Sequence, residues 1–176
     1  VLSDGQNKSL NEINNAFKDK AVVLFQGVTG SGKTEVYIEL ISQAVGIGKQ
    51  VLYLLPEISL TPQIVKRLQM FFGNEVTVYH SKFSVNERTE IWNNVIEKSP
   101  KAKIIIGTRS ALFLPFQNLG LLIVDEEHEL SYKQFDPSPR YHARDSAVIL
   151  ARIHKAKVLL GSATPSLESS FNQRSG

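Results

Sequence analysis

Cysteine is absent from this 176-residue sequence, and so are long apolar runs. Without cysteine the chain can form neither disulfides nor thiolate metal sites. No apolar segment approaches the roughly 20 residues that span a bilayer. The first ten residues, VLSDGQNKSL, also lack the apolar core of a signal peptide. These absences predict a cytoplasmic protein with no membrane segment.

What is present is typical of one globular domain over residues 1–176. Hydrophobic residues make up 42% of the chain and charged residues 21%, which is the balance of a folded protein rather than a disordered one. The formal net charge is +3 and the isoelectric point is near 9.1. This mild excess of cations permits a nucleic-acid partner without requiring one.

Short β-rich apolar runs alternate with amphipathic helical stretches along the chain. The expected strands are residues 21–26, 50–55, 76–80, 103–108, 121–126 and 157–162. Most are continuously apolar, as strands covered on both faces are. Helical spacing follows the first strand, at Tyr37, Leu40, Ile41 and Ala44, with a stop at Gly46. Capping-box spacing marks two more helix starts, at Ser9–Glu12 and Ser84–Glu87. The pattern predicts an α/β domain with a mostly parallel sheet and helices on both faces.

The segment GVTGSGKT, residues 27–34, matches the phosphate-binding loop G-x-x-x-x-G-K-S/T and lies between an expected strand and an expected helix. Its members are Gly27, Val28, Thr29, Gly30, Ser31, Gly32, Lys33 and Thr34. Lys33 would reach the β- and γ-phosphates of a nucleotide, and Thr34 would offer its hydroxyl to Mg²⁺. A plain glycine-rich turn is the alternative. A dinucleotide-binding loop is excluded, because Glu35 stands where its third glycine is needed.

An apolar strand ends in an acidic cluster at residues 125–129, DEEHE. Carboxylates so close together repel one another and need a compensating cation if buried. A magnesium nucleotide supplies one, so Asp125 is expected to bind Mg²⁺ and Glu126 to activate the attacking water. The alternative is a solvated acidic helix start.

These two motifs resemble motifs I and II of superfamily 2 helicases of the D-E-x-H type. GTRSALF, residues 107–113, is similar to motif Ib, and GSAT, residues 161–164, to motif III. The blocks LLPEISLTPQ, DEEHELSYKQ, RYHARD and GSATPSLES resemble the PriA family of replication-restart helicases. The resemblance covers nearly the whole chain. It implies the first, N-terminal RecA-like P-loop NTPase lobe of a longer two-lobed helicase.

The resemblance also implies an activity and its partners. It implies ATP hydrolysis with Mg²⁺, driving 3′-to-5′ movement on single-stranded and forked DNA during primosome assembly and fork restart. It implies single-strand DNA-binding protein and primosome components as partners. Family members carry zinc on cysteines outside this lobe. The alternatives are another D-E-x-H DNA translocase and a nucleotide-gated DNA-binding module.

Two residue roles follow from the resemblance alone. His128 would connect the γ-phosphate site with motif III, although a satisfied or capping histidine is the alternative. The family reads adenine with a glutamine near the start of the first helix, where Asn14 is the most natural match. Asparagine carries the same amide on a shorter arm, which leaves adenine selectivity open.

The loop from Ser131 to Arg144 interleaves aromatic and basic residues, a pattern typical of single-strand binding. The expected DNA contacts there are Tyr132, Lys133, Phe135, Arg140 and Tyr141. Hydroxyl and arginine side chains elsewhere are candidates for phosphate contacts, namely Ser59, Thr61, Thr108, Arg109 and Ser110. Packing under the loop is the alternative for the aromatics. An N-cap is the alternative for Ser59.

Overall fold

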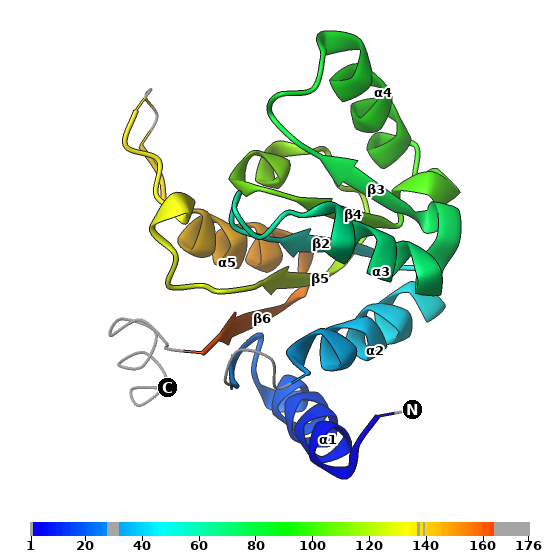
Figure 1. Cartoon of the computed structure of the whole chain (residues 1–176), viewed down its shortest axis with the longest axis vertical. Coiled ribbons are helices and arrows are strands. Elements are labelled where there is room, and N and C mark those ends of the chain that lie inside the picture. Colours follow the sequence, from blue (N-terminus) through cyan, green and yellow to red (C-terminus); the bar gives the residue numbers. More distant parts are fainter. Residues whose placement is uncertain (1, 28–31, 137, 139, 164–176) are drawn as a thin grey trace.

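A computed structural model describes residues 2–27, 32–136, 138 and 140–163 of the chain. Six parallel strands form one sheet in the order β1-β6-β5-β2-β4-β3 (Figure 1). The strands are β1 (Val22–Gln26), β2 (Gln50–Leu54), β3 (Val76–Tyr79), β4 (Ile104–Gly107), β5 (Leu119–Val124) and β6 (Lys157–Ser162). The expected α/β fold is confirmed, and every described strand pair is parallel.

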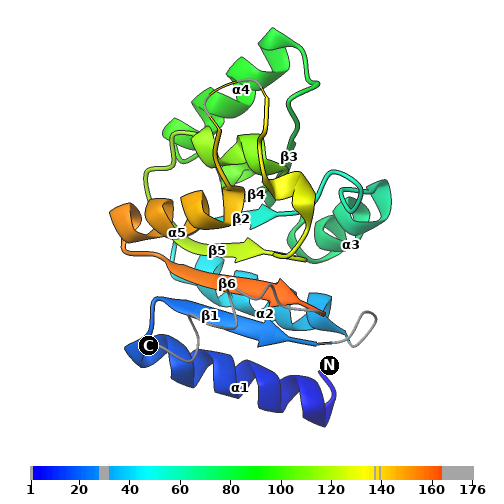
Figure 2. The same cartoon turned by 90° about the vertical axis from the view of Figure 1, so that its left-hand side faces the viewer.

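Helices cover both faces of the sheet (Figure 2). One face carries α1 (Asp4–Asp19), α2 (Lys33–Gly46) and α3 (Pro62–Phe72). The other carries α4 (Val85–Ile96), the 3₁₀ helix η3 (Arg109–Phe113) and α5 (Ala143–His154). Strand residues alternate between the two cores: in β5, Ile123 packs with the first group and Leu122 with the second. This explains the continuously apolar strands.

Of the helix boundaries predicted from local signals, two are confirmed and one is wrong. Helix α4 begins at the predicted capping box, in which Ser84 and Glu87 cap each other, and α2 ends at Gly46 as predicted. The predicted start at Ser9 is wrong, because α1 begins at Asp4 behind a capping box made by Ser3 and Gln6. Both serines satisfy the same spacing rule, and only the earlier one is used.

The parallel arrangement decides where chemistry can occur. The carboxyl ends of β1, β6 and β5 lie side by side, and they lead into the phosphate loop, motif III and the acidic cluster. Ligands of open α/β sheets bind beyond the carboxyl ends of the strands. Within the described ranges, no helix is long and apolar enough to cross a bilayer.

Candidate functional site: the carboxyl ends of β1, β6 and β5

The acidic cluster is divided among separate partners as soon as β5 ends. Asp125 still pairs with β2, since its N–H donates to the carbonyl of Leu54 at 3.0 Å. Glu126 then adopts a left-handed backbone with φ of 47°. Such a conformation costs a non-glycine residue about 1–3 kcal/mol and is concentrated at functional sites. The turn sends neighbouring carboxylates in different directions, which relieves the repulsion expected from the sequence.

Lys33 is the cation that pairs with Glu126 of this cluster. Its Nζ lies 3.0 Å from Oε1 of Glu126, and both side chains are largely withdrawn from solvent, at 8% and 22% exposure. Lys33 is the first residue of α2, and Glu126 follows β5, so the pair joins motif I to motif II. Two of the residues predicted to be catalytic are thus brought into direct contact.

Asp125 is held by two buried phenols. The Tyr37 hydroxyl donates to Oδ1 at 2.9 Å, and the Tyr53 hydroxyl donates to Oδ2 at 3.1 Å. Burial raises the pKa of Asp125, while the Tyr37 hydrogen bond and the Lys33 charge oppose that shift. Burial and the Asp125 charge also raise the pKa values of Tyr37 and Tyr53, so both phenols stay protonated donors.

Glu127 is fully buried, between the start of α5 and β6. Its carboxylate pairs with Arg144 of α5 at 3.3 Å, and its N–H donates to the carbonyl of Gly161 in β6 at 3.0 Å. A buried carboxylate of this kind needs such a partner. Glu127 therefore fastens the acidic turn to β6 and to the start of α5, and it is a structural member of the motif.

His128 connects the acidic turn with motif III. Its Nδ1 lies 2.7 Å from Oγ of Ser162, the last residue of β6, and 3.8 Å from Oε2 of Glu126. The link to motif III expected from the resemblance is present in the geometry. Contact of His128 with a γ-phosphate stays a prediction.

The phosphate loop is described only at its two ends. Val28, Thr29, Gly30 and Ser31 lie outside the described residues. Gly27 continues the β1–β6 pairing by donating its N–H to the carbonyl of Ser162 at 3.1 Å. Gly32 caps α2 in a left-handed conformation, with φ of 80°. A Cβ at this position would overlap the amide of Gln6, so the loop approaches its neighbour as only glycine allows.

The donor chemistry at this end of the sheet fits a magnesium nucleotide. Mg²⁺ prefers oxygen ligands and usually takes one or two from the protein, the rest coming from phosphates and water. The Asp125 carboxylate and the Thr34 hydroxyl are of this kind, and Thr34 stands in the first turn of α2 beside Lys33. The positive end of the α2 dipole adds to the attraction for phosphate.

Gln6, which the sequence analysis passed over, is the amide that touches the phosphate loop. Its Nε2 donates to the carbonyl of Gly32 at 3.3 Å, while its Oε1 accepts from the Ser3 N–H at 2.7 Å. Asn14 lies eight residues further along α1, which is about 12 Å of helix. Asn14 is therefore not the residue that touches the phosphate loop, and its contact with adenine stays a prediction. The missed signal was the Ser3–Gln6 capping box.

Tyr132 is buried under the acidic turn. It is 1% exposed, and its hydroxyl lies 2.6 Å from the carbonyl oxygen of Asp125 and 3.0 Å from that of Leu54. The prediction that Tyr132 stacks on DNA is wrong for this conformation, and the packing alternative holds. The Tyr132 hydroxyl instead links the residue that follows β5 to the last residue of β2.

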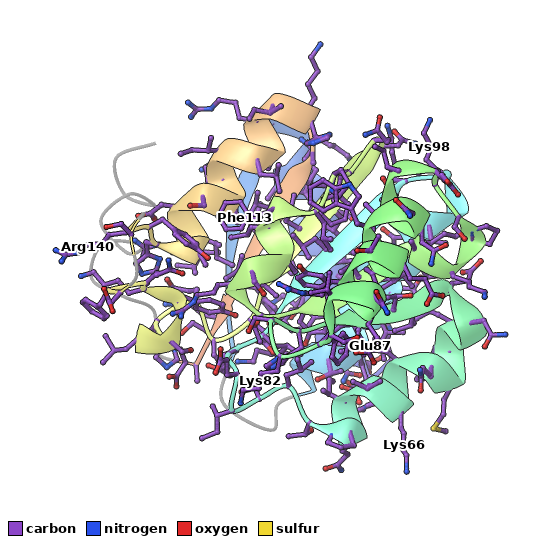
Figure 3. The ribbon with its side chains drawn as sticks, turned by 90° about the horizontal axis from the view of Figure 1, so that it is seen from above. Lys66, Lys82, Glu87, Lys98, Phe113 and Arg140 are labelled. Atoms are coloured by element: carbon purple, nitrogen blue, oxygen red, sulfur yellow. The ribbon has the colours of Figure 1, made fainter. Side chains whose placement is uncertain are left out.

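The rest of the aromatic loop divides into exposed and half-buried residues. Lys133, Phe135 and Arg140 are exposed, and the Lys133 ammonium lies 5.5 Å from the centre of the Phe135 ring. Tyr141 is half-buried and packs edge to face on Phe113 at 5.2 Å. Figure 3 shows Arg140 projecting outward at the margin of the molecule. Among the described residues of the loop, one aromatic ring and two cations are therefore exposed to solvent.

The residues around motif Ib are less accessible than the sequence suggested. Thr108 is 2% exposed, and the Oγ of Ser110 is buried with no hydrogen-bond partner among the described residues. Neither hydroxyl is open to a DNA strand in this conformation, and strand contact by these two residues stays a prediction. Arg109 donates from Nη1 to the carbonyls of Ser131 and Lys133, at 3.0 and 3.2 Å. It holds the base of the aromatic loop.

Ser59 and Thr61 precede α3 at the end of β2. Thr61 is the N-cap residue of α3 and is exposed, and Ser59 is half-buried. The alternative role of Ser59 as the cap is therefore wrong. Contact of either hydroxyl with a DNA phosphate stays a prediction.

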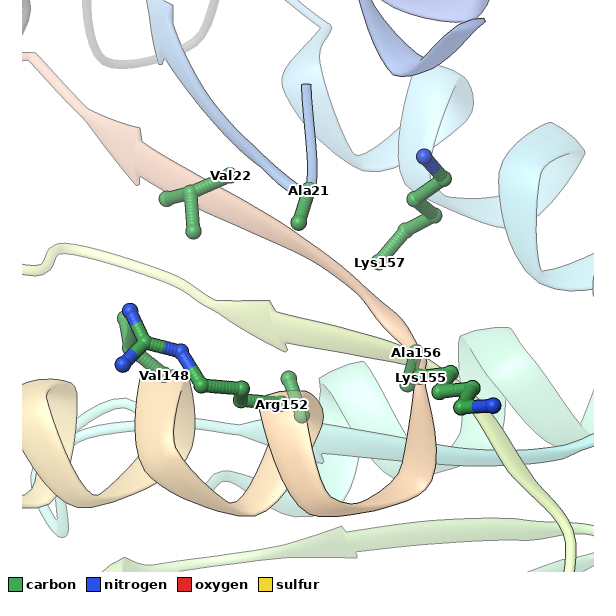
Figure 4. A pocket seen from close by; sticks show the side chains of 8 residues that line it. Ala21, Val22, Val148, Arg152, Lys155, Ala156 and Lys157 are labelled. Carbon is green, nitrogen blue, oxygen red and sulfur yellow. The ribbon is translucent and has the colours of Figure 1, made fainter. Parts of the chain in front are cut away.

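A cavity of about 300 Å³ lies at the other end of the sheet, between the starts of β1 and β6 and the end of α5 (Figure 4). Arg152, Lys155 and Lys157 are among its lining residues. The Lys157 ammonium already donates to the carbonyls of Phe17 and Lys20, where α1 ends. This cavity is separated from the phosphate loop by the length of the strands.

A family model and individual relatives were matched to the chain. The model described as "DEAD/DEAH box helicase" matches residues 3–171. The chain is 53% identical to "Replication restart protein PriA" of Haemophilus influenzae over 155 residues, and 48% identical to the protein of that name from Bacillus subtilis over 155 residues. Each alignment covers 88% of this chain. The resemblance found in the motifs is confirmed.

The chain spans about a fifth of the length of these curated relatives, 21% and 19% respectively. Among solved structures, "Structure of RecG bound to three-way DNA junction" is similar, with a TM-score of 0.68 and 25% identity. That alignment covers 97% of this chain and 22% of the RecG chain. The fold predicted from the sequence is therefore shared with this solved structure.

Proposed function

This chain belongs to the DEAD/DEAH box helicase family, and from that premise we propose that it is the first RecA-like motor lobe of a PriA-type DNA helicase. In the proposal the lobe binds ATP with Mg²⁺ and couples its hydrolysis to 3′-to-5′ movement on single-stranded DNA. Its setting is the restart of stalled forks in the cytoplasm. Forked DNA, single-strand DNA-binding protein and primosome components are the proposed partners.

The observation that carries the proposal is the 3.0 Å pair between Lys33 and Glu126. It joins the end of the phosphate loop to the carboxylate beside the metal-binding aspartate. Neither motif alone would require this contact, since 93 residues separate the two side chains. A site in which the phosphate-binding cation meets a carboxylate poised to accept a proton is suited to hydrolysis as well as binding.

The pair also suggests how hydrolysis is prepared. Lys33 neutralises Glu126 in this structure. Nucleotide phosphates compete for the same ammonium, so their arrival frees the Glu126 carboxylate to accept a proton from water. Mg²⁺ held by Thr34 and Asp125 would neutralise charge on the phosphate oxygens. His128 is hydrogen-bonded to Ser162 and lies 3.8 Å from Glu126, so a movement of Glu126 on phosphate binding would be transmitted through His128 to the end of β6.

Coupling to DNA is proposed to run through the aromatic loop. Phe135, Lys133 and Arg140 are exposed for contact with a strand. The base of the loop is fixed by Arg109 and by Tyr132, whose hydroxyl reaches the carbonyl of Asp125. A base stacked on Phe135 therefore acts on a segment that is joined to the metal-binding end of β5.

A nucleotide-gated DNA-binding module is the second candidate. Such a switch needs Lys33 and the metal ligands but no proton acceptor. The strained backbone at Glu126 argues against it, because a left-handed glutamate costs stability that binding alone does not require. Another D-E-x-H DNA translocase would share all of these features, and the identity of 53% to a replication restart protein favours the restart helicase.

The aromatic loop gives the test of the proposal in a two-lobed form of the helicase. Phe135→Ala is expected to lower the DNA-stimulated rate of phosphate release while the basal rate stays unchanged. One lost stacking contact is worth about 1–3 kcal/mol, so the DNA concentration for half-stimulation should rise about 5- to 160-fold. Exposed Phe71 of α3 supplies a matched control, Phe71→Ala. Parallel loss of basal and stimulated rates in Phe135→Ala would sink the coupling proposal.

The amide at the phosphate loop gives a second prediction. If Gln6 supports the adenine end of the site, Gln6→Ala should reduce the preference for ATP over GTP in competition binding, whereas Asn14→Ala should not. A hydrogen bond of this kind contributes about 0.5–1.5 kcal/mol, or roughly 2- to 12-fold. An unchanged preference in Gln6→Ala, with loss in Asn14→Ala, would restore the original prediction from the sequence.

A further inference from the structure

Two buried tyrosines form a clamp on Asp125. They come from different elements, Tyr37 from α2 and Tyr53 from β2, and each donates to a different carboxylate oxygen. Both rings are 0% exposed, and they pack edge to face with centroids 5.7 Å apart. Phenylalanine at either position would fill the apolar core equally well. The two tyrosine hydroxyls are instead both used as hydrogen-bond donors to the Asp125 carboxylate.

The helix repeat aligns this clamp with the lysine–glutamate pair. Tyr37 is four residues after Lys33, so the two side chains lie one above the other on the same face of α2. Lys33 meets Glu126, and Tyr37 meets Asp125, its neighbour in the chain. One face of α2 therefore contacts both Asp125 and Glu126 of motif II.

The two carboxylate oxygens of Asp125 accept different numbers of hydrogen bonds. Oδ1 of Asp125 accepts from Tyr37 at 2.9 Å and from the N–H of Glu126 at 3.1 Å, whereas Oδ2 accepts from Tyr53 at 3.1 Å. A carboxylate has about four lone-pair sites, two on each oxygen. The remaining site on Oδ2 is the one open to a metal ion or its water.

Motif III contributes to the same clamp through a glycine. A Cβ added at Gly161 of β6 would overlap the Tyr37 hydroxyl and lie 3.1 Å from Oδ1 of Asp125. The phenol thus fills the space that a side chain at Gly161 would take. Phe25, the strand partner of Gly161, packs on the other edge of Tyr37 at 6.2 Å.

We propose that Tyr37 and Tyr53 are positioning residues that hold the Asp125 carboxylate so that Oδ2 faces Mg²⁺, with Gly161 keeping the space that Tyr37 needs. The inference rests on the proposed function, since it assumes that Asp125 is the metal ligand. Neither tyrosine touches the nucleotide in this assignment. The clamp acts on metal affinity and leaves phosphate binding to the loop.

The test uses calorimetric ADP titrations of the 176-residue chain, at a series of Mg²⁺ concentrations and in EDTA. Tyr37→Phe and Tyr53→Phe should each raise the Mg²⁺ concentration for half-maximal enhancement of ADP binding about tenfold, as loss of groups that orient metal ligands does. Affinity for ADP in EDTA should stay unchanged. Gly161→Ala should resemble Tyr37→Phe, and the combined variant should be less than additive, because both changes disrupt one contact.

The controls separate positioning from general damage. Tyr79→Phe changes a phenol on β3 at the far edge of the sheet, and Gly46→Ala adds a methyl group where the glycine has open space. Both should leave the Mg²⁺ dependence as it is. An unchanged Mg²⁺ dependence in Tyr37→Phe and Tyr53→Phe overturns the clamp, as does a loss of ADP affinity that is equal with and without Mg²⁺. Failure of the unmodified chain to bind ADP overturns the proposed function instead.

Discussion

Tested alone, the 176-residue chain is expected to bind ATP but to hydrolyse it about 10³–10⁵ times more slowly than a form that carries a second RecA-like lobe. An arginine that stabilises the transferring phosphoryl group is worth about that factor. On the side of the sheet that would face the nucleotide, the described cation beside the acidic pair is Lys33, which is already engaged with Glu126. The measurement is steady-state phosphate release with saturating single-stranded DNA.

The slow rate expected for the single lobe must be distinguished from contaminating ATPase, which requires an inactive variant purified in the same way. Glu126→Gln in the same 176-residue chain serves this purpose, because any rate it retains reports contaminating ATPase. A rate for the unmodified chain within tenfold of the two-lobed form would mean that the catalytic groups all lie within this lobe. The proposed division of labour between lobes would then be wrong.

In the two-lobed form, Glu126→Gln is expected to lower ATP hydrolysis by about 10²–10⁴, the range that a positioned general base contributes. Nucleotide affinity should be retained or increased, because the substitution removes the carboxylate that competes with phosphates for Lys33 at 3.0 Å. Opposite changes in turnover and affinity are the signature of this pair. Single-turnover hydrolysis and equilibrium ADP binding measure them separately.

Glu129→Gln is the matched control for that substitution. Glu129 belongs to the same acidic cluster and is half-buried, but no role in hydrolysis is assigned to it. Its replacement should leave turnover within about twofold of the parent. Equal losses in both variants would point to the summed charge of the cluster, and normal turnover in Glu126→Gln would place the base elsewhere.

The strands, and the place of the phosphate-loop motif between β1 and α2, could be predicted because their signals are local. Continuous apolar runs predicted strands that are covered on both faces. In β5, successive side chains pack into the two cores on opposite faces of the sheet, so every position is apolar. The order of the strands could not be predicted from those runs. It brings β6 between β1 and β5, and thereby sets Ser162 beside His128.

The roles of individual aromatics were harder to predict, because a tyrosine in an apolar run looks the same whether its hydroxyl is used or not. Tyr132 lies among basic residues, as a base-stacking residue would, yet its hydroxyl is needed at the end of β5. In the sequence, Tyr37 stood out only for its helical spacing, and Tyr53 only as part of the strand expected at residues 50–55. Their common partner, Asp125, is 88 and 72 residues away in the chain. A contact between residues so far apart in sequence cannot be predicted from a local pattern.

The contact between Gln6 and Gly32 illustrates the same limit for a polar residue. Ser3–Gln6 and Ser9–Glu12 both have capping-box spacing, and spacing alone does not choose between them. Gln6 of the box that is used also donates a hydrogen bond to the carbonyl of Gly32 in the phosphate loop. This contact spans 26 residues of sequence, so no local pattern could predict it.

The most direct test of the central claim is a calorimetric titration of ADP with Mg²⁺ into the 176-residue chain and its Lys33→Ala variant. Loss of a hydrogen-bonded cation at the phosphates is expected to weaken binding about 10- to 100-fold, from the roughly 1.5–3 kcal/mol that such bonds contribute. Lys66→Ala is the control, since Lys66 is exposed on α3 and points into solvent (Figure 3). The account predicts one site per chain, weakened only by Lys33→Ala. Equal affinity in the parent and in Lys33→Ala would contradict it.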